Sequence, residues 1–238
     1  MRLFITFDND SISPDIQPLW GFATYIELPQ KDLMFDTGSD GRVLLKNMAK
    51  MGLSASNASR LFLSHPHWDH IGGLDSVIEL NPTLPITLTS SFSPRLVANL
   101  RSLGHEVQVI QEPTLIDDGL WSTGAMGEIG EQGLVISTPK GAILVVGCAH
   151  PGIVQMVRRA KELVGEVLYA IGGFHLFWSG ADEIWQVARA LKAEGLSFVT
   201  PTHCSGDVAK EIFAQVFGDG YIPGGAGRVI ELSKLAVV

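Results

Sequence analysis

The sequence predicts a mixed α/β (α+β) fold, with two sheets packed together and helices on the outside. Short apolar segments of strand length outnumber helical segments about two to one, which disfavours strict alternation around one parallel sheet. A series of strands followed by helices also occurs twice, before and after about residue 115. No linker, low-complexity tract or charge run divides the chain, which predicts a single domain over residues 1–238.

Helices are predicted where apolar residues at helical spacing end at a glycine, because glycine readily adopts the left-handed conformation that closes a helix. The helical segments are residues 42–51, 94–103, 152–164, 181–194 and 206–217. Start signals agree with three of them: Pro151 suits a first turn, and Asp182 and Ser205 are expected to cap the fourth and fifth helices.

Strands are predicted between the helices from short apolar segments, several of them rich in β-branched and aromatic residues. The segments are residues 3–7, 22–28, 33–36, 60–64, 86–89, 107–110, 134–137, 142–147, 166–173, 197–201 and 228–232.

The composition is that of a globular enzyme rather than a nucleic-acid-binding protein. Hydrophobic residues make up 46% and charged residues 18% of the chain, which is enough for a large core. The net charge of −8 argues against binding to nucleic acid, which depends on clustered Lys and Arg. A small phosphorylated ligand is compatible with this acidity, because a bound metal inverts the local field.

The N-terminus has no apolar run long enough for a signal peptide, and no segment approaches the roughly 20 apolar residues that cross a bilayer. We therefore expect a cytoplasmic protein without a membrane partner. Cys148 and Cys204 are too few for a disulfide framework, and we expect reduced thiols. Cys148 would share a face with His150 on a continuing strand, but buried packing is the more common role for either thiol.

The most informative segment is Ser64–Leu74, which places His65, His67, Asp69 and His70 within six residues, directly after a predicted strand. Imidazole and carboxylate are good ligands for zinc, iron or manganese. The chain has only seven histidines, so a chance cluster in a polar surface loop is disfavoured. The segment predicts a metal site.

Three more histidines follow predicted strands: His150, His175 and His203. Binding residues in α/β architectures lie where buried strands give way to loops. A lone histidine at such a position usually has a structural role, but three of them beside a ligand cluster favour a function. His105 follows a helix end, where a solvated or capping side chain is expected.

The segment His65-Pro66-His67-Trp68-Asp69-His70 resembles the His-x-His-x-Asp-His signature of the metallo-β-lactamase superfamily. Phe35-Asp36-Thr37-Gly38 resembles the earlier Asp-x-Gly motif of that superfamily. The resemblance covers the whole chain and implies a four-layer αββα sandwich.

The resemblance also implies the roles of individual residues. One metal would be held by His65, His67 and His150, and a second by Asp69, His70 and His203. Asp69 would also accept a proton, and His203 or His175 would serve the leaving group. Asp36 would orient the ligand loop. Independently of the resemblance, Trp68 is a candidate for contact with substrate, because it lies inside the ligand loop. One or two zinc ions are expected, with manganese or iron as alternatives.

The sequence departs from the superfamily at the position of the aspartate that usually bridges two metals. Gly172, Gly173 and Phe174 stand there, followed by His175. Three alternatives follow: His175 supplies a replacement nitrogen, the second metal site is weak, or His175 contacts substrate.

One branch of the superfamily is similar in further segments. GCAHPGI, GGFHL, THCSG, the Glu131-Gln132-Gly133-Leu134 segment and Phe7-Asp8-Asn9 resemble the group of the archaeal dihydropterin–(ribofuranosyl)aminobenzene phosphate synthase. This resemblance makes Glu131 a candidate pocket residue and a phosphorylated or pterin-like small molecule a candidate substrate.

Three functions are compatible with the sequence. The first is a metal-dependent hydrolase of a small ester or phosphoester, working through metal-activated water. The second is a metal-dependent transferase that condenses a substrate like a dihydropterin diphosphate. The third is a mononuclear iron oxygenase or a non-catalytic binding module. The sequence leaves the oligomeric state open.

Overall fold

The computed structural model describes residues 1–235, which divide into two compact units. Unit 1 consists of Met1–Ile110 and the C-terminal segment that begins at Gly225, and unit 2 consists of Gln111–Gly224. The boundary at Ile110 lies close to residue 115, about where the succession of strands and helices was expected to repeat. The prediction of a single domain over residues 1–238 stays a prediction.

Unit 1 contains a seven-stranded mixed sheet in the order β13-β1-β2-β3-β4-β5-β6. The strands are β1 (Arg2–Phe7), β2 (Ala23–Glu27), β3 (Asp32–Phe35), β4 (Ala58–Phe62), β5 (Ile86–Thr89), β6 (Val107–Ile110) and β13 (Val229–Glu231). Neighbours from β13 to β3 pair antiparallel, and those from β3 to β6 pair parallel. The parallel strands bring their carboxyl ends to one edge of the sheet.

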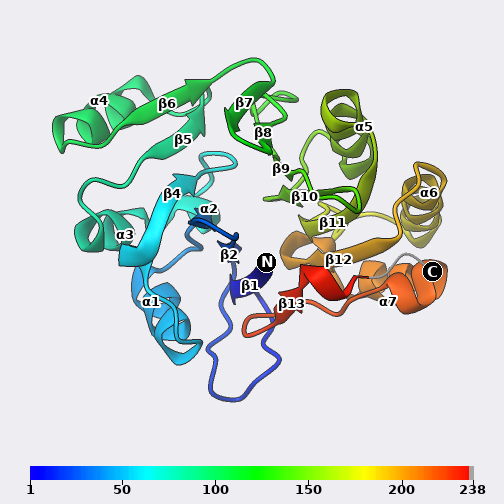
Figure 1. The fold of residues 1–238 in the computed structure, drawn as a ribbon. Helices are drawn as coiled ribbons and strands as arrows, with labels where there is room; N and C mark the ends of the chain where they lie inside the picture. The colour runs from blue at the N-terminus through cyan, green and yellow to red at the C-terminus, as the bar shows by residue number, and fades with distance from the viewer. Residues whose placement is uncertain (236–238) are drawn as a thin grey trace. The chain divides into compact units, whose positions relative to one another are not determined.

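Helices cover one face of this sheet (Figure 1). They are α1 (Gly41–Lys50), α2 (Trp68–Ile71), α3 (Leu74–Leu80) and α4 (Pro94–Ser102), with short 3₁₀ turns at Ala55–Asn57 and Leu232–Lys234. Asp40 caps α1 by accepting the backbone N–H groups of Arg42 and Val43. Leu44 and Met48 on the inner face of α1 pack with strand residues in a continuous apolar core.

Unit 2 contains a six-stranded mixed sheet in the order β12-β11-β10-β9-β8-β7. The strands are β7 (Thr114–Asp117), β8 (Leu120–Ser122), β9 (Leu134–Ile136), β10 (Ala142–Val146), β11 (Val167–Gly173) and β12 (Phe198–Thr202). Neighbours from β7 to β10 pair antiparallel, and β10, β11 and β12 run parallel. Unit 2 therefore also gathers the carboxyl ends of parallel strands at one edge.

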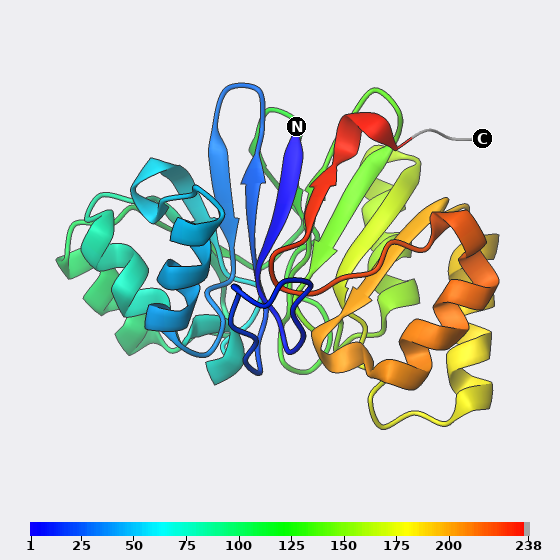
Figure 2. The ribbon, with the colours of Figure 1, turned by 90° about the horizontal axis from the view of Figure 1, so that it is seen from below.

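The helices of unit 2 cover one face of its sheet, with α6 (yellow) beside α7 (orange) in Figure 2. They are α5 (Ile153–Val164), α6 (Ala181–Ala193) and α7 (Asp207–Phe217), with 3₁₀ turns at His203–Ser205 and Gly218–Gly220. Leu144 and Val146 of β10 pack with Met156 of α5 and Phe213 of α7. Alternate residues of β10 thus bury the apolar faces of the helices.

The predicted fold class is confirmed: the chain folds as two mixed sheets with outer helices. Each predicted helix is present, and none of its ends differs from the prediction by more than one residue. The three predicted start signals are wrong. Pro151 lies before Gly152, the N-cap of α5, and therefore outside the first turn. Gly180 precedes α6 and leaves Asp182 within the first turn, and Ser205 accepts the backbone N–H of Phe174 instead of capping α7. Among residues 1–235, none of the helices is long and apolar enough to cross a membrane.

Three further features were not predicted from the sequence. The short helices α2 and α3 follow β4, and the hairpin β7–β8 turns at Asp118-Gly119. His105 is buried with Nδ1 3.0 Å from the carbonyl oxygen of Leu84, so the expectation of a solvated or capping side chain is wrong. The ring reaches across to the turn before β5 and fixes the start of that strand.

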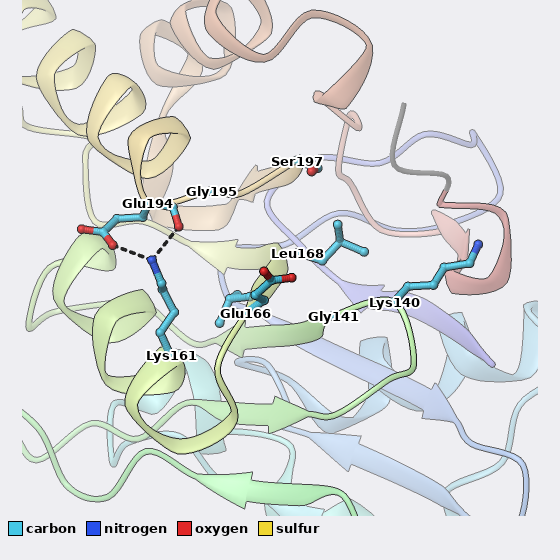
Figure 3. A pocket seen from close by; sticks show the side chains of 9 residues that line it. Lys140, Gly141, Lys161, Glu166, Leu168, Glu194, Gly195 and Ser197 are labelled. Carbon is cyan, nitrogen blue, oxygen red and sulfur yellow. Dashed lines mark hydrogen bonds and ion pairs between the residues drawn. The ribbon is translucent and has the colours of Figure 1, made fainter.

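The amino ends of β10, β11 and β12 border a cavity of about 410 Å³ (Figure 3). Lys161 extends from α5 toward the end of α6, where its Nζ donates to the carbonyl oxygen of Glu194 at 2.7 Å and to Oε2 at 2.9 Å. The candidate histidines of unit 2 follow the opposite ends of the same strands. This cavity is therefore separate from the candidate site.

Candidate metal-binding site

All the candidate ligands follow parallel strands at their carboxyl ends. In unit 1, Asp36 follows β3 and the segment His65–His70 follows β4. In unit 2, His150, His175 and His203 follow β10, β11 and β12 respectively. Loops at these ends are where open α/β sheets place binding groups.

In unit 1, the histidine rings lie in contact. The centroid of the His65 ring is 4.5 Å from that of His67 and 4.2 Å from that of His70. Asp69 Oδ2 lies 4.0 Å from His70 Nε2. Because α2 begins directly after His67, its single turn places Asp69 and His70 on the buried side. The structure thus brings together the four residues of the ligand motif.

The donor atoms of this cluster fit a divalent metal. His65 Nε2 and His67 Nδ1 are 3.1 Å apart. Two nitrogen ligands of a tetrahedral zinc at about 2.0–2.1 Å would be about 3.3 Å apart. Nitrogen and carboxylate donors also suit manganese and iron, so the donor set does not distinguish these metals.

Asp36 holds the ligand loop in place. Its Oδ1 accepts the backbone N–H of Ser64 at 2.7 Å, and its Oδ2 accepts the Ser64 hydroxyl at 2.6 Å and His70 Nδ1 at 2.7 Å. The Ser64 oxygen in turn lies 2.9 Å from His65 Nδ1. Since a carboxylate only accepts, these bonds place the protons of His65 and His70 on Nδ1 and leave Nε2 of each ring for a metal.

Trp20 is a site residue that was not predicted from the sequence. Its indole Nε1 donates to Asp69 Oδ2 at 2.8 Å, and so orients the carboxylate from a loop 49 residues away in the chain. Trp20 belongs to none of the sequence motifs, and only the tertiary structure brings it to Asp69. Trp68 is the first residue of α2 and is 64% exposed, so its indole faces solvent beside the ligand motif.

Left-handed backbone conformations occur at the same loops. Among the described non-glycine residues, positive φ angles are found at Asp36 (56°), Ala149 (56°), His175 (52°) and His203 (48°). Non-glycine residues adopt this region uncommonly, and such strain persists where the surrounding contacts impose it. Each of these residues lies immediately after a parallel strand or within the loop that follows it, where the chain turns sharply.

Glu131 anchors the loop after β10. Its Oε1 accepts the backbone N–H groups of Cys148 at 2.9 Å and Ala149 at 2.8 Å, and its Oε2 accepts that of His150 at 2.8 Å. The side chain is fully buried. One carboxylate therefore satisfies three consecutive backbone donors and fixes the position from which the His150 side chain extends.

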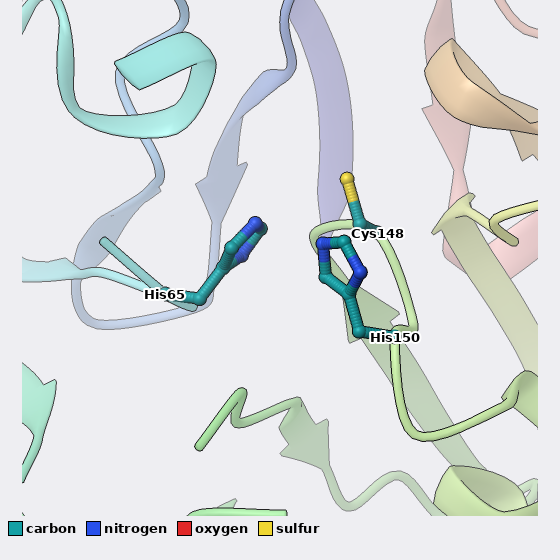
Figure 4. Close-up of side chains that lie close together, drawn as sticks. All are labelled: His65, Cys148 and His150. Atoms are coloured by element: carbon teal, nitrogen blue, oxygen red, sulfur yellow. The ribbon is translucent and has the colours of Figure 1, made fainter. Parts of the chain in front are cut away.

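The other side chains of unit 2 gather around His175. The ring centroids of His150 and His175 are 4.2 Å apart. Ligand atoms of Cys148, His175 and Cys204 all lie within 4.8 Å of one another. Figure 4 shows Cys148 and His150 extending from the same loop after β10; the picture also draws His65 of unit 1. The loop after β12 contributes His203, which is buried.

Cys204 and His175 influence each other's proton affinity. Burial raises the pKa of the Cys204 thiol, but hydrogen bonds with Cys148 and His175 outweigh burial and hold that pKa well below its ordinary value. The hydrogen bond with Cys204 raises the pKa of His175, against the opposing effect of burial. Both shifts favour a negative sulfur beside a positive imidazole.

A cavity of about 280 Å³ in unit 2 adjoins His150 and His175. Its walls combine apolar side chains, among them Ile153 and Leu176, with the polar side chains of Gln155 and Glu183. A mainly apolar pocket with a few polar groups is typical of a small-molecule site.

The chain is similar to several characterised proteins. Residues 18–89 match the family model of the Metallo-beta-lactamase superfamily. The 7,8-dihydropterin-6-methyl-4-(beta-D-ribofuranosyl)-aminobenzene-5'-phosphate synthase of Methanocaldococcus jannaschii is 28% identical, over 90% of this chain and 91% of that protein.

Two solved structures resemble the fold over nearly its full length. Tm1679, a metal-dependent hydrolase of the beta-lactamase superfamily, has 25% identity and a TM-score of 0.83, covering 98% of this chain and 99% of the other. The metallo-beta-lactamase fold protein YhfI from Bacillus subtilis has a TM-score of 0.71, with 97% and 99% of the two chains covered. Its 14% identity supports likeness of fold alone.

Proposed function

We propose that the chain is a metal-dependent hydrolase of the metallo-β-lactamase superfamily that acts on a small ester or phosphoester. The observation that carries this proposal is the contact of the His65, His67 and His70 rings beside Asp69, on a loop held by Asp36. The similarity to Tm1679 supports hydrolysis.

The proposed metal ligands are the six residues that the family motifs indicate. They are His65, His67, Asp69 and His70 of unit 1 and His150 and His203 of unit 2. Proton positions in unit 1 support this assignment, since Nδ1 of His65 and of His70 already bonds to oxygen. Either one or two ions are compatible with the donors, and zinc is the ion for which we propose to test first.

A bound divalent metal would supply Lewis acidity, which strengthens water as a nucleophile at neutral pH and polarises an acyl or phosphoryl oxygen. Asp69 is proposed to accept the proton of the attacking water, with its carboxylate oriented by the Trp20 indole. His175, exposed beside the 280 Å³ cavity, is proposed to donate a proton to the leaving group. His203 is the alternative donor where only one ion is bound and His203 is not a ligand. The cavity suits a small substrate.

A transferase is the second candidate, favoured by similarity to the synthase from Methanocaldococcus jannaschii over most of both chains. In this reaction an amine or carbon nucleophile of a second substrate replaces water, and diphosphate leaves a dihydropterin-like substrate. The same metal ligands and the same proton donors would serve both reactions. A phosphorylated, pterin-related small molecule is therefore the substrate class that we propose to test.

Replacement of His65 and His67 by alanine tests the metal assignment. We expect the double variant to bind fewer metal ions than the wild type, measured by mass spectrometry of the purified proteins, and to lose activity on bis(p-nitrophenyl) phosphate and p-nitrophenyl acetate. His105→Gln is the matched control, because His105 is the one histidine outside the candidate set and bonds to Leu84. Full metal occupancy in the double variant would refute the site.

The metal content of the wild-type protein also separates the alternatives. Two zinc or manganese ions favour hydrolysis or transfer, a single iron favours oxygen chemistry, and a metal-free protein favours a binding module. To separate hydrolysis from transfer, diphosphate release from a dihydropterin diphosphate is measured with and without an aromatic amine. Release that requires the amine supports the transferase, whereas release without it supports the hydrolase.

A further inference from the structure

We propose that Cys148, His175 and Cys204 form a sulfur-rich metal-binding triad in unit 2, which takes Zn²⁺ or an ion of similar softness. This triad goes beyond the ligand set proposed above, which contains no sulfur. It is composed of residues of unit 2 alone. Where the triad holds an ion, His203 rather than His175 would be the proton donor of the proposed function.

The three side chains come from three consecutive parallel strands. Cys148 follows β10, His175 follows β11 and Cys204 follows β12. Their ligand atoms lie within 4.8 Å of one another. A tetrahedral zinc with sulfur at about 2.3 Å and nitrogen at about 2.0–2.1 Å requires separations of about 3.5–3.8 Å. The separations in the structure are at most 4.8 Å, and so exceed the required ones by no more than about 1.3 Å.

Gly173 explains how the Cys204 sulfur reaches this place. A Cβ at position 173 would lie 2.6 Å from Cys204 Sγ and 2.6 Å from the carbonyl oxygen of Gly147. Only glycine therefore allows the sulfur to pack against the end of β11. Cys204 Sγ also lies 3.6 Å from the carbonyl oxygen of Cys148. The thiol occupies the volume into which any other side chain at 173 would extend.

Backbone hydrogen bonds fasten the three loops to one another. The carbonyl oxygen of Cys204 accepts the N–H groups of Leu176 at 3.1 Å and Phe177 at 3.0 Å, which ties the loop after β12 to that after β11. Glu131 holds the N–H of Cys148 at 2.9 Å. The left-handed conformation of His175 then turns its ring toward the two sulfurs. Such support by neighbouring loops preorganises a ligand set before the ion binds.

The arrangement differs from that of ordinary buried thiols. Cys148 and Cys204 are buried, but His175 is exposed and stands beside both sulfurs. Thiols that only pack in a core are expected to have apolar neighbours. Here the His175 imidazole, on the solvent side, adds a nitrogen donor to the two sulfurs. Two sulfurs and one imidazole favour zinc, cobalt and cadmium over magnesium, manganese and calcium.

Cobalt titration of the metal-free full-length protein tests the triad directly. The chain contains two cysteines, so any sulfur-to-Co²⁺ charge-transfer absorption in the near ultraviolet must arise from Cys148 or Cys204. We expect this band in the wild type and roughly half its intensity in Cys148→Ser and in Cys204→Ser. The Cys148→Ser/Cys204→Ser double variant should show no band. His175→Asn keeps a residue type that tolerates the left-handed conformation and should weaken Co²⁺ affinity at least about tenfold.

Circular dichroism and thermal unfolding confirm that each serine variant is folded before it is titrated. The proposal is overturned if the wild type binds Co²⁺ without the sulfur band, or if the band persists in the Cys148→Ser/Cys204→Ser double variant. Unchanged Co²⁺ affinity in His175→Asn also overturns the three-ligand set. Failure of the proposed function is distinguishable, because it appears as unchanged metal content and unchanged activity in the His65→Ala/His67→Ala variant. The sulfur band tests the triad separately, since it is expected to remain in that variant whatever its activity.

Discussion

Two buried carboxylates perform the same task in the two units. Asp36 accepts the backbone N–H of Ser64, and Glu131 accepts three consecutive N–H groups from Cys148 to His150. In both places the loop after a parallel strand would otherwise leave backbone donors buried without partners, at a cost of about 1–3 kcal/mol for each. The carboxylates remove that cost and set the direction of the imidazoles.

The residue Asp36 is expected to tune metal affinity through His70. Asp36→Asn keeps the shape and tolerates the φ of 56°, but its amide N–H₂ would oppose the N–H of His70. We expect zinc affinity, measured by competition with a chromophoric chelator, to fall about 10–100-fold. Asp40→Asn is the control, because asparagine caps a helix as well as aspartate does. Equal affinities of wild type and Asp36→Asn would contradict the orienting role.

Glu131 is expected to matter for stability as well as for the site. Glu131→Gln replaces one acceptor oxygen by an N–H₂ group that faces a buried backbone N–H. The free energy of unfolding in urea should fall by about 1–3 kcal/mol. Glu128→Gln, on the exposed turn three residues before, should change it by no more than about 0.5 kcal/mol. If the two variants are equally stable, the loop does not depend on this carboxylate.

At the scale of elements, the parallel strands decide where the chemistry lies. In unit 2, β10, β11 and β12 carry the candidate ligands at their carboxyl ends and border the 410 Å³ cavity at their amino ends. At the amino-end side, two helices are joined by ion pairs. Glu194, just after α6, pairs with Arg158 of α5 at 2.6 Å and with Lys161 of α5 at 2.9 Å. This pairing fastens the helices that cover the sheet.

The Glu194 contacts predict a pH dependence. Its hydrogen bonds with Arg158 and Lys161 hold the pKa of Glu194 below its ordinary value of 4.5. A lowered pKa means that the stabilisation is present above the unfolded-state pKa and disappears as pH falls through the folded-state pKa. Glu194→Gln should therefore cost about 1 kcal/mol or less at pH 7, and this difference should shrink below pH 4.5.

Urea unfolding of wild type and Glu194→Gln at several pH values measures this difference. Glu211→Gln, an exposed position on α7, serves as the control for the loss of one negative charge. A stability difference that grows as the pH falls would contradict a lowered pKa of Glu194 in the folded protein.

At the scale of the whole molecule, each unit has its own sheet, its own helices and its own apolar core. Each unit also supplies its own group of candidate ligands at the carboxyl edge of its parallel strands. Ions that bind the folded loops and not the unfolded chain stabilise the native state by mass action.

Removal of metal should therefore lower the melting temperature. An ion at about 100 times its Kd contributes about 2.7 kcal/mol. A chain of this length shifts by about 2–4 °C for each kcal/mol, so excess EDTA should lower Tm by about 5–11 °C, reversibly on return of zinc. The His65→Ala/His67→Ala variant should respond less to EDTA. An unchanged wild-type Tm after verified loss of metal would contradict this coupling.

The local sequence was sufficient for the helices, most strands and the ligand motif. Apolar periodicity and terminal glycines predict α1 and α4 to α7, because both signals act within a few residues. The hairpin β7–β8 also has a local signal, since Asp118-Gly119 is a residue pair that favours a tight turn. The caps at Asp182 and Ser205 were wrong, because the loop geometry before each helix, rather than residue type, decides which side chain reaches the backbone.

Tertiary structure alone decided which distant groups share a site. Trp20 meets Asp69 across 49 residues, and Cys148 meets Cys204 across 56, and neither pair has a periodic or spaced signal in the sequence. The parallel pairing of β10, β11 and β12 brings Cys148 close to Cys204, because the carboxyl ends of parallel strands lie at one edge of the sheet. The sequence by itself determined most of the elements and the motif of candidate metal ligands, whereas the pairing of strands determined which groups lie beside each candidate ligand.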